Sequence, residues 1–122
     1  MALVGLDHLQ LAIPPGGEAR ARQFWIDLLG LREVPKPPAL AVRGGLWLTL
    51  PDGRAVHLGV ESPFVPAKKA HPALRCDDLD ALAARCLAAG HPPRWSDEIP
   101  TLRRFHLDDP FGNRVEIVDA GP

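Results

Sequence analysis

The chain has 122 residues, of which 46 % are hydrophobic and 24 % are charged, and its formal net charge is −1. This length supports one compact domain, or two small modules that share a core. The near-neutral charge, with scattered Lys and Arg, argues against nucleic acid as the main partner. No apolar run approaches the ~20 residues that span a bilayer, so no membrane partner is expected.

The N-terminus lacks the basic region and apolar stretch of a signal peptide. Cys76 and Cys86 do not form a CxxC pair, and we expect both to be reduced. The sequence therefore predicts a cytoplasmic protein.

The first half predicts a strand, a helix and then further strands. The helix carries apolar residues on one stripe, and Gly30 is a typical residue just after a helix end. Leu40–Arg43 and Leu46–Leu50 are strand-like and can form one bent strand, with Gly44-Gly45 as a bulge or turn. The expected elements are a strand in Leu3–Ile13, a helix over Glu18–Leu29, and strands at Leu31–Val34, Leu40–Arg43, Leu46–Leu50 and Ala55–Glu61.

The second half repeats this order. Asp77 or Asp78 is expected to cap its helix, and Gly90 to end it. Strands are expected at His71–Cys76, His91–Trp95, Arg103–Leu107 and Arg114–Asp119. Each half therefore reads as β-α-β-β-β. We predict one domain, residues 1–122, made of modules 1–61 and 71–122 with the linker 62–70, since neither half alone buries much surface.

An internal duplication underlies this organisation. The stretch PDGRAVHL, which begins at Pro51, is matched 59 positions later by PFGNRVEI, which begins at Pro110. This offset superposes His57 on Glu116, and an offset of 63 superposes His8 on His71. Four potential metal ligands therefore occupy two related pairs of positions.

Three segments carry a resemblance to a known superfamily: GLDHLQLAI at the start, LLGL at the end of the first helix, and DPFGNRVEIVD at the end. They resemble the vicinal oxygen chelate superfamily, which contains glyoxalase I, fosfomycin-resistance thiol transferases, extradiol dioxygenases and bleomycin-resistance proteins. The resemblance covers essentially the whole chain. It implies an α+β, glyoxalase-like fold, in which two βαβββ modules form a curved mixed sheet around a cleft.

The resemblance also implies a metal in that cleft, held by ligands from the first and last strands of each module. Three imidazoles and one carboxylate suit Zn, Ni, Fe, Co or Mn better than Ca or Mg. For each residue the alternative is structural: a partly buried histidine, or a carboxylate facing outward from an edge strand. Relatives place Glu, Gln, His or no ligand at the fourth position, that of His57. The candidate ligands are His8, His57, His71 and Glu116.

Further site residues follow from the same comparison. His106 lies 59 positions after Trp47, where fosfomycin-resistance relatives carry a substrate-contacting Tyr. We expect His106 and Glu116 to act in catalysis, and Trp47 and Arg103 to contact substrate. The alternatives are a surface histidine in a hairpin for His106 and a solvent-facing charge for Arg103.

The expected function is a metal-dependent enzyme acting on a small oxygen-bearing metabolite or electrophile, of the lyase, isomerase or thiol-transfer type. The chain has no Tyr, which argues against dioxygenase and fosfomycin activities, and only one of the two usual glyoxalase I glutamates is present. The alternative is a metal-free protein that sequesters a small molecule, as bleomycin-resistance proteins do. The stiff, proline-containing linker predicts a homodimer, with His8 and His57 of one chain facing His71 and Glu116 of the other.

Overall fold

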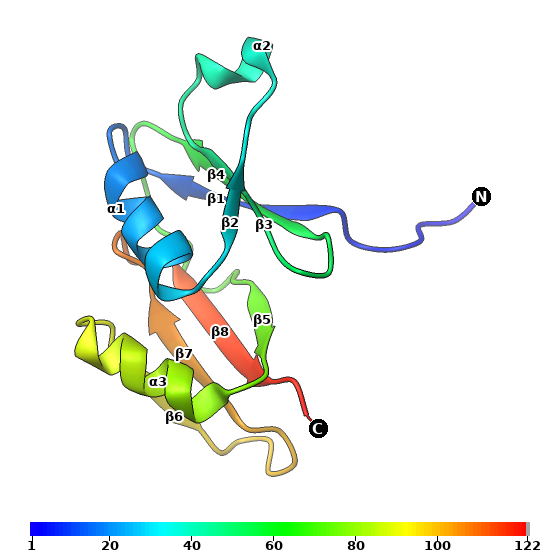
Figure 1. The fold of residues 1–122 in the computed structure, drawn as a ribbon, viewed down its shortest axis with the longest axis vertical. Coiled ribbons are helices and arrows are strands. Elements are labelled where there is room, and N and C mark those ends of the chain that lie inside the picture. The colour runs from blue at the N-terminus through cyan, green and yellow to red at the C-terminus, as the bar shows by residue number, and fades with distance from the viewer. Residues whose placement is uncertain (122) are drawn as a thin grey trace. The chain divides into compact units, whose positions relative to one another are not determined.

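The computed structural model describes residues 1–121 and divides into two compact units. The first unit is Met1–Val65 and the second begins at Pro66. The boundary lies inside the expected linker 62–70. Each unit contains a four-stranded sheet (Figure 1).

The first unit has the strand order β1-β4-β3-β2. The outer strand β1 runs parallel to β4, and the other neighbours are antiparallel. Its elements are β1 (His8–Ile13), α1 (Glu18–Arg22), the π-helix η1 (Gln23–Leu28), β2 (Arg32–Val34), α2 (Pro38–Ala41), β3 (Leu46–Thr49) and β4 (Ala55–Val60).

The second unit has the equivalent order β5-β8-β7-β6, again with one parallel pair, β5 with β8. Its elements are β5 (Ala73–Cys76), α3 (Leu79–Ala88), β6 (Arg94–Ser96), β7 (Arg104–Asp108) and β8 (Arg114–Asp119). The predicted α+β class with two βαβββ modules is therefore confirmed.

The expected strand over Leu40–Arg43 is wrong, because Leu40 and Ala41 end the short helix α2, and Val42 and Arg43 form the turn after it. Pro38 stands in the first turn of α2, where its fixed φ suits a helix and its missing N–H has no partner to lose. Both following glycines have positive φ, so they form a turn. A side chain at Gly45 would place its Cβ 2.1 Å from the Leu58 carbonyl oxygen.

The two main helices differ in regularity. The helix expected over Glu18–Leu29 is present, but its second half is π-helical, with Leu29 N donating to Phe24 O at 2.9 Å. In the second unit, Asp78 is the helix cap and accepts from Ala81 N at 3.1 Å. This contact decides between the two predicted caps.

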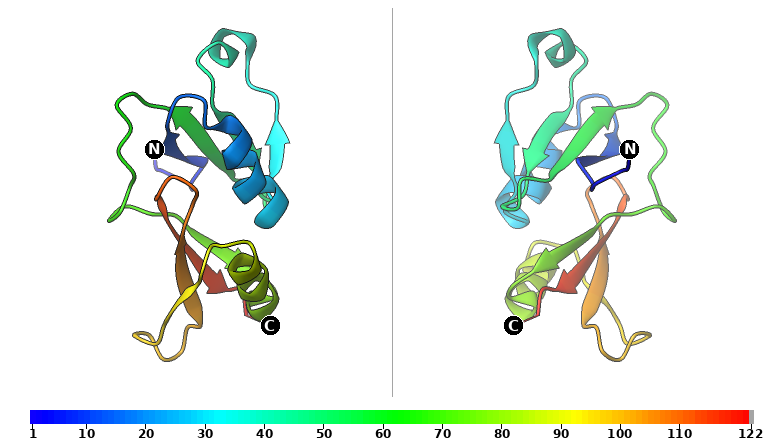
Figure 2. Two further views of the ribbon diagram at one scale, coloured as in Figure 1. Left: turned by 90° about the vertical axis from the view of Figure 1, so that its left-hand side faces the viewer. Right: turned by 90° about the vertical axis from the view of Figure 1, so that its right-hand side faces the viewer.

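Each sheet packs one face on its own unit's helix (Figure 2). In the second unit, Phe105 and Leu107 of β7 are fully buried. Since side chains alternate along a strand, His106 between them points to the opposite face of the sheet. The apolar core therefore fixes which face carries the polar residues of the candidate site.

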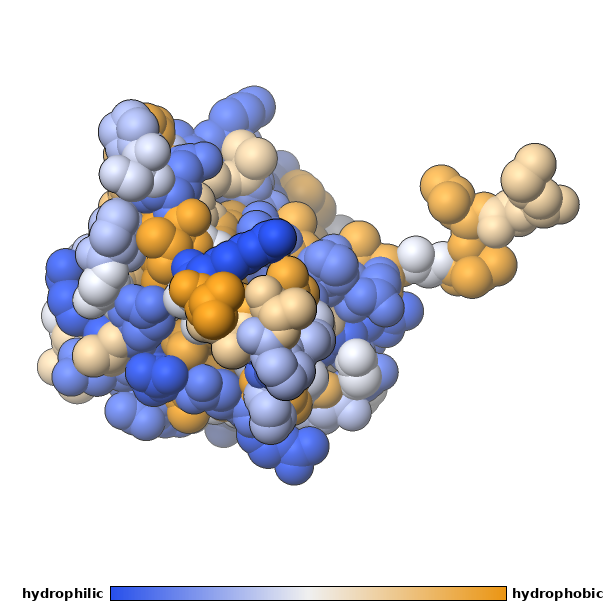
Figure 3. All heavy atoms as spheres, turned by 90° about the horizontal axis from the view of Figure 1, so that it is seen from above, coloured by the Kyte–Doolittle hydropathy of each residue, from blue (hydrophilic) through white to orange (hydrophobic). Residues whose placement is uncertain are grey.

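The N-terminal segment before β1 is exposed and extends away from the first sheet (Figure 1), and it forms a protruding arm in the space-filling view (Figure 3). Its apolar residues Met1, Leu3 and Val4 are all essentially fully accessible to solvent. No helix in the described part of the chain is long and apolar enough to cross a membrane.

A polar turn closes the β7–β8 hairpin of the second unit. Asn113 is completely buried, and its amide donates to Asp109 Oδ2 at 3.0 Å. Its carbonyl oxygen accepts from Ala67 N at 2.9 Å, and this contact ties the segment before β5 to the hairpin. The equivalent residue of the first unit, Arg54, is exposed.

We predict that Asn113→Ala lowers the free energy of unfolding by ~1–3 kcal/mol, because it leaves buried partners of the amide unsatisfied. Arg54→Ala, at the equivalent exposed turn, is the matched control and should stay within ~0.5 kcal/mol of the parent protein. Urea unfolding followed by circular dichroism measures both. Equal effects of the two substitutions would contradict the structural role of Asn113.

Candidate metal site

The site begins with a cross-strand pair in the second sheet. His106 of β7 lies directly opposite Glu116 of β8, so both side chains emerge from the same face. The Nε2 atom of His106 lies 3.1 Å from Oε1 of Glu116. Both residues are buried, although each is polar. A buried carboxylate needs compensating partners.

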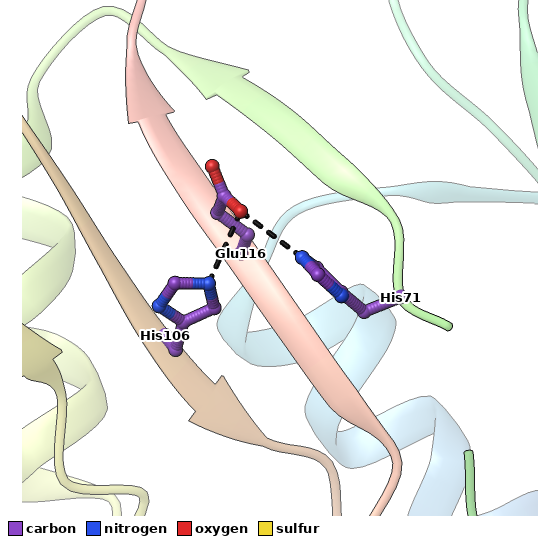
Figure 4. A group of neighbouring side chains, drawn as sticks. All are labelled: His71, His106 and Glu116. Carbon is purple, nitrogen blue, oxygen red and sulfur yellow. Dashed lines mark hydrogen bonds and ion pairs between the residues drawn. The ribbon is translucent and has the colours of Figure 1, made fainter. Parts of the chain in front are cut away.

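His71 approaches the same carboxylate oxygen from the segment before β5. Glu116 N donates to Pro72 O at 2.9 Å, which fixes this segment beside β8. The Nε2 atom of His71 lies 3.0 Å from Glu116 Oε1 (Figure 4). Its Nδ1 lies 2.9 Å from the carbonyl oxygen of Lys69, and this contact orients the ring with Nε2 toward the carboxylate.

Arg104 completes the surroundings of Glu116. Its guanidinium donates to the second carboxylate oxygen, Oε2, at 3.2 Å. Burial alone would raise the pKa of the Glu116 carboxyl, but the hydrogen bonds from His71 and Arg104 and the nearby positive charges hold this pKa below its ordinary value. Glu116 is therefore an anion at neutral pH, with Oε1 directed toward two imidazoles.

His106 is held in its neutral form. Burial lowers the pKa of His106, the charge of Arg114 lowers it further, and the contact with Glu116 only partly opposes this shift. A neutral imidazole can act as a metal ligand or accept a proton.

The three side chains meet the requirements of a metal site. The potential ligand atoms of His71, His106 and Glu116 all lie within 4.8 Å of one another. Two imidazoles and one carboxylate form a donor set suited to borderline divalent metals such as iron or zinc. The second carboxylate oxygen is oriented by Arg104, as partners of metal ligands commonly are. The residues present therefore fit a divalent ion.

The first unit carries a different group at the equivalent positions. Trp47 pairs with His57 across β3 and β4, just as His106 pairs with Glu116. The ring of His57 stacks on Trp47 at 4.3 Å on one side and on His8 at 4.1 Å on the other. His8 also contacts Asp7 at 2.8 Å. The first pair of predicted ligands is thus brought together inside the first unit.

The predicted substrate contact Arg103 is engaged elsewhere in its unit. Its guanidinium donates to both carboxylate oxygens of Asp80, at 2.9 and 3.1 Å, and lies 5.2 Å from the centre of the Trp95 ring. The residue that reaches Glu116 is its neighbour Arg104. Its position two residues before His106 on one strand was the available signal.

Comparison with known proteins agrees with this architecture. Residues 13–118 match the family model described as the glyoxalase-like domain, so the chain belongs to that family and to the vicinal oxygen chelate superfamily. A glyoxalase family protein from Bacillus anthracis is 38 % identical, with a TM-score of 0.93 over 98 % of this chain and 97 % of that one. Comparison with curated protein sequences finds no significant match.

Two more distant structures share the fold. The fosfomycin resistance protein FosX from Listeria monocytogenes is 14 % identical, with a TM-score of 0.76 over 98 % of this chain and 96 % of that one. The antibiotic-binding protein TnmS3 from Streptomyces sp. CB03234 is 22 % identical, with a TM-score of 0.77 over 99 % of both chains.

The histidine environments predict a pH-dependent stability. Burial and the nearby charge of His8 lower the pKa of His57, and burial lowers that of His106, both from the ordinary value of 6.5. The unfolded chain therefore binds more protons than the folded chain as the pH falls through 6.5, so stability falls. Glu116 contributes a further loss only when the pH falls below its ordinary value of 4.5.

We predict that the urea concentration at the unfolding midpoint of the chelator-treated protein decreases as the pH is lowered from about 7.5 to about 5.5. His57→Phe keeps an aromatic ring in the stack but removes its titration, so this variant should show a smaller fall. An equal fall in the variant and the parent would contradict the assignment to His57.

Proposed function

We propose that the chain is a metal-dependent enzyme that acts on a small oxygen-bearing metabolite or electrophile, by lyase, isomerase or thiol-transfer chemistry. The observation that carries this proposal is the convergence of His71 and His106 on one oxygen of the buried Glu116. An ordinary cluster of charged side chains on the surface would leave its carboxylate exposed to solvent. Membership in the glyoxalase-like domain family supports the same class of chemistry.

In this proposal, His71 and Glu116 are ligands of one divalent ion, and His8 and His57 complete the set. The donor types suit Zn, Ni, Fe, Co or Mn. When bound, such an ion supplies Lewis acidity toward substrate oxygens. The chain's own task is to hold the Glu116 carboxylate in place, and Arg104 does this through Oε2.

His106 lies in the same cluster of potential ligands, but in this proposal it carries protons while His71 and Glu116 bind the metal. Its lowered pKa keeps the imidazole neutral, so it can accept a proton from substrate and return it later. Glu116, which contacts Nε2 of His106, orients the ring and stabilises its protonated form. Trp47 and Arg103 remain the proposed substrate contacts.

A second candidate function is metal-free sequestration of a small molecule. The observation that favours it is that both carboxylate oxygens of Glu116 have protein partners, His71 and His106 at Oε1 and Arg104 at Oε2. TnmS3, which shares the fold, is described as an antibiotic-binding protein. Metal content after purification without a metal column separates the two functions, since the second requires none.

We predict that Glu116→Gln and His71→Ala each lower Mn²⁺ affinity by more than about 100-fold, since even the partners of ligands account for ~10–100-fold. His91→Ala is the matched control, because His91 lies outside the cluster of potential ligands found among the described residues. Calorimetry and elemental analysis measure binding. Unchanged metal content in both variants would refute the ligand assignment.

The same metal-binding measurement, together with a turnover assay, tests the role of His106. His106→Ala should retain the metal but lower turnover of any substrate found. Loss of metal from this variant would make His106 a ligand and contradict its proposed role.

We also propose a homodimer in which His8 and His57 of one chain face His71 and Glu116 of the other. The exposed apolar residues Met1, Leu3 and Val4 support an association between chains. In such a dimer, two variants that each lack one ligand complement each other, because the mixed dimer contains one intact site.

We therefore predict that mixing His8→Ala with Glu116→Gln partly restores metal binding, whereas each variant alone does not bind. Sedimentation should show a dimer at micromolar concentration. A monomer that still binds metal would refute the dimer, and no recovery after verified subunit exchange would refute the shared site.

A further inference from the structure

The face of the second sheet that carries the His106–Glu116 pair is rich in arginine. Side chains two residues apart along a strand share a face, and so do residues directly opposite each other on neighbouring strands. By these rules each strand of the sheet contributes one arginine to this face: Arg75 of β5, Arg94 of β6, Arg104 of β7 and Arg114 of β8.

The first sheet lacks this charge. The strand registers give equivalents for the arginines of β5, β6 and β8, and none of these equivalents is charged: Ala12, Val34 and Ala55. The positive charge therefore belongs to the second sheet and not to the backbone arrangement that the two units share.

Two of these arginines pair with carboxylates on the same face. Arg94 donates to Asp108 Oδ1 at 3.0 Å, and Arg104 donates to Glu116 Oε2 at 3.2 Å. Asp108 is the residue directly opposite Arg114, so its pairing with Arg94 takes the carboxylate that would otherwise lie nearest to Arg114 across the strands. Arginines therefore outnumber carboxylates on this face, which attracts anions.

Arg114 is the cation that this arrangement leaves available beside the candidate site. It lies two residues before Glu116 on the same face of β8, or ~7 Å along the strand. Its guanidinium has no ion pair or hydrogen bond among residues 1–121. Burial lowers the pKa of His106 and the charge of Arg114 lowers it further, so the guanidinium acts on that imidazole. Arg114 is half-buried, and partial removal from water strengthens its attraction for an anion.

We propose that the substrate of the candidate site is a small organic anion and that its carboxylate pairs with Arg114. A guanidinium and a carboxylate match each other in a planar, two-point geometry. A molecule held in this way would extend its neighbouring oxygen-bearing carbon toward His106 and Glu116. This inference names a substrate class for the proposed function and rests on that function for the chemistry, but not for the binding.

The test compares pyruvate, which has a carboxylate next to an oxygen-bearing carbon, with pyruvamide, its neutral counterpart. Both are titrated into the full chain in the presence of a chelator, and binding is followed by NMR. Pyruvate should bind at least about tenfold more tightly than pyruvamide, because only pyruvate carries a charge that pairs with a guanidinium. Equal binding of the two compounds would overturn the inference without any variant.

Arg114→Gln should abolish the preference for pyruvate, whereas Arg114→Lys, which keeps the charge but not the two-point geometry, should retain part of it. Arg75→Gln is the matched control, because it removes a positive charge without an ion-pair partner among residues 1–121 from the same face, on another strand. Equal losses in Arg75→Gln and Arg114→Gln would mean that the whole face attracts anions, and would overturn the assignment to Arg114.

Metal binding is measured separately, with Mn²⁺ and without pyruvate. Absence of Mn²⁺ binding would refute the proposed function and leave a preference for pyruvate in support of Arg114 as an anion site. Mn²⁺ binding together with equal affinities for pyruvate and pyruvamide would refute this inference and leave the proposed function standing.

Discussion

The buried carboxylate of Glu116 is the constraint on which the second unit depends. A carboxylate removed from water is costly, and removing one of its partners typically costs ~3–5 kcal/mol. Here the partners come from three separate places: the segment before β5, and two positions on β7. The network therefore holds β5, β7 and β8 in one register. Stability and chemistry share the same residues.

The two units show how one backbone supports different chemistry. Their sheets have the same strand order and the same cross-strand partners at equivalent positions. The first unit places an indole opposite an imidazole and forms a stack of three rings. The second places an imidazole opposite a carboxylate and forms a charged network. Only the second set of side chains supplies a fixed negative charge.

Much of this organisation could be predicted from the sequence, because duplication constrains both copies at once. The 59-residue offset predicted that Trp47 and His106 occupy equivalent strand positions, and the registers confirm it. Turn glycines and the apolar stripes located the helices. The strand predicted over Leu40–Arg43 was wrong because a short apolar run such as Leu40-Ala41-Val42 fits a strand as well as a helix, and the nearby Pro38 favours the helix.

The finer contacts of the site could not be predicted. Alternation along β7 places Arg104 and His106 on one face, but it does not say which carboxylate they reach. Arg103 and Arg104 are adjacent in sequence and go to different partners, Asp80 and Glu116. That choice depends on the position of α3, which supplies Asp80, and therefore on packing between elements distant in the sequence.

The two proposed functions differ in one physical respect, which is what the side chains of His71 and Glu116 bind. In the sequestering protein these two side chains would stay in direct contact with each other. In the enzyme they would hold a divalent ion, and Arg104 would keep the carboxylate oriented.

The proposal that His71 and Glu116 bind a metal is tested most directly by a crystal structure of the protein soaked with Zn²⁺, with anomalous data on both sides of the zinc absorption edge. An anomalous peak is expected in contact with His71 Nε2 and Glu116 Oε1. A fully occupied zinc site elsewhere, with the direct contact between His71 and Glu116 unchanged, would contradict it.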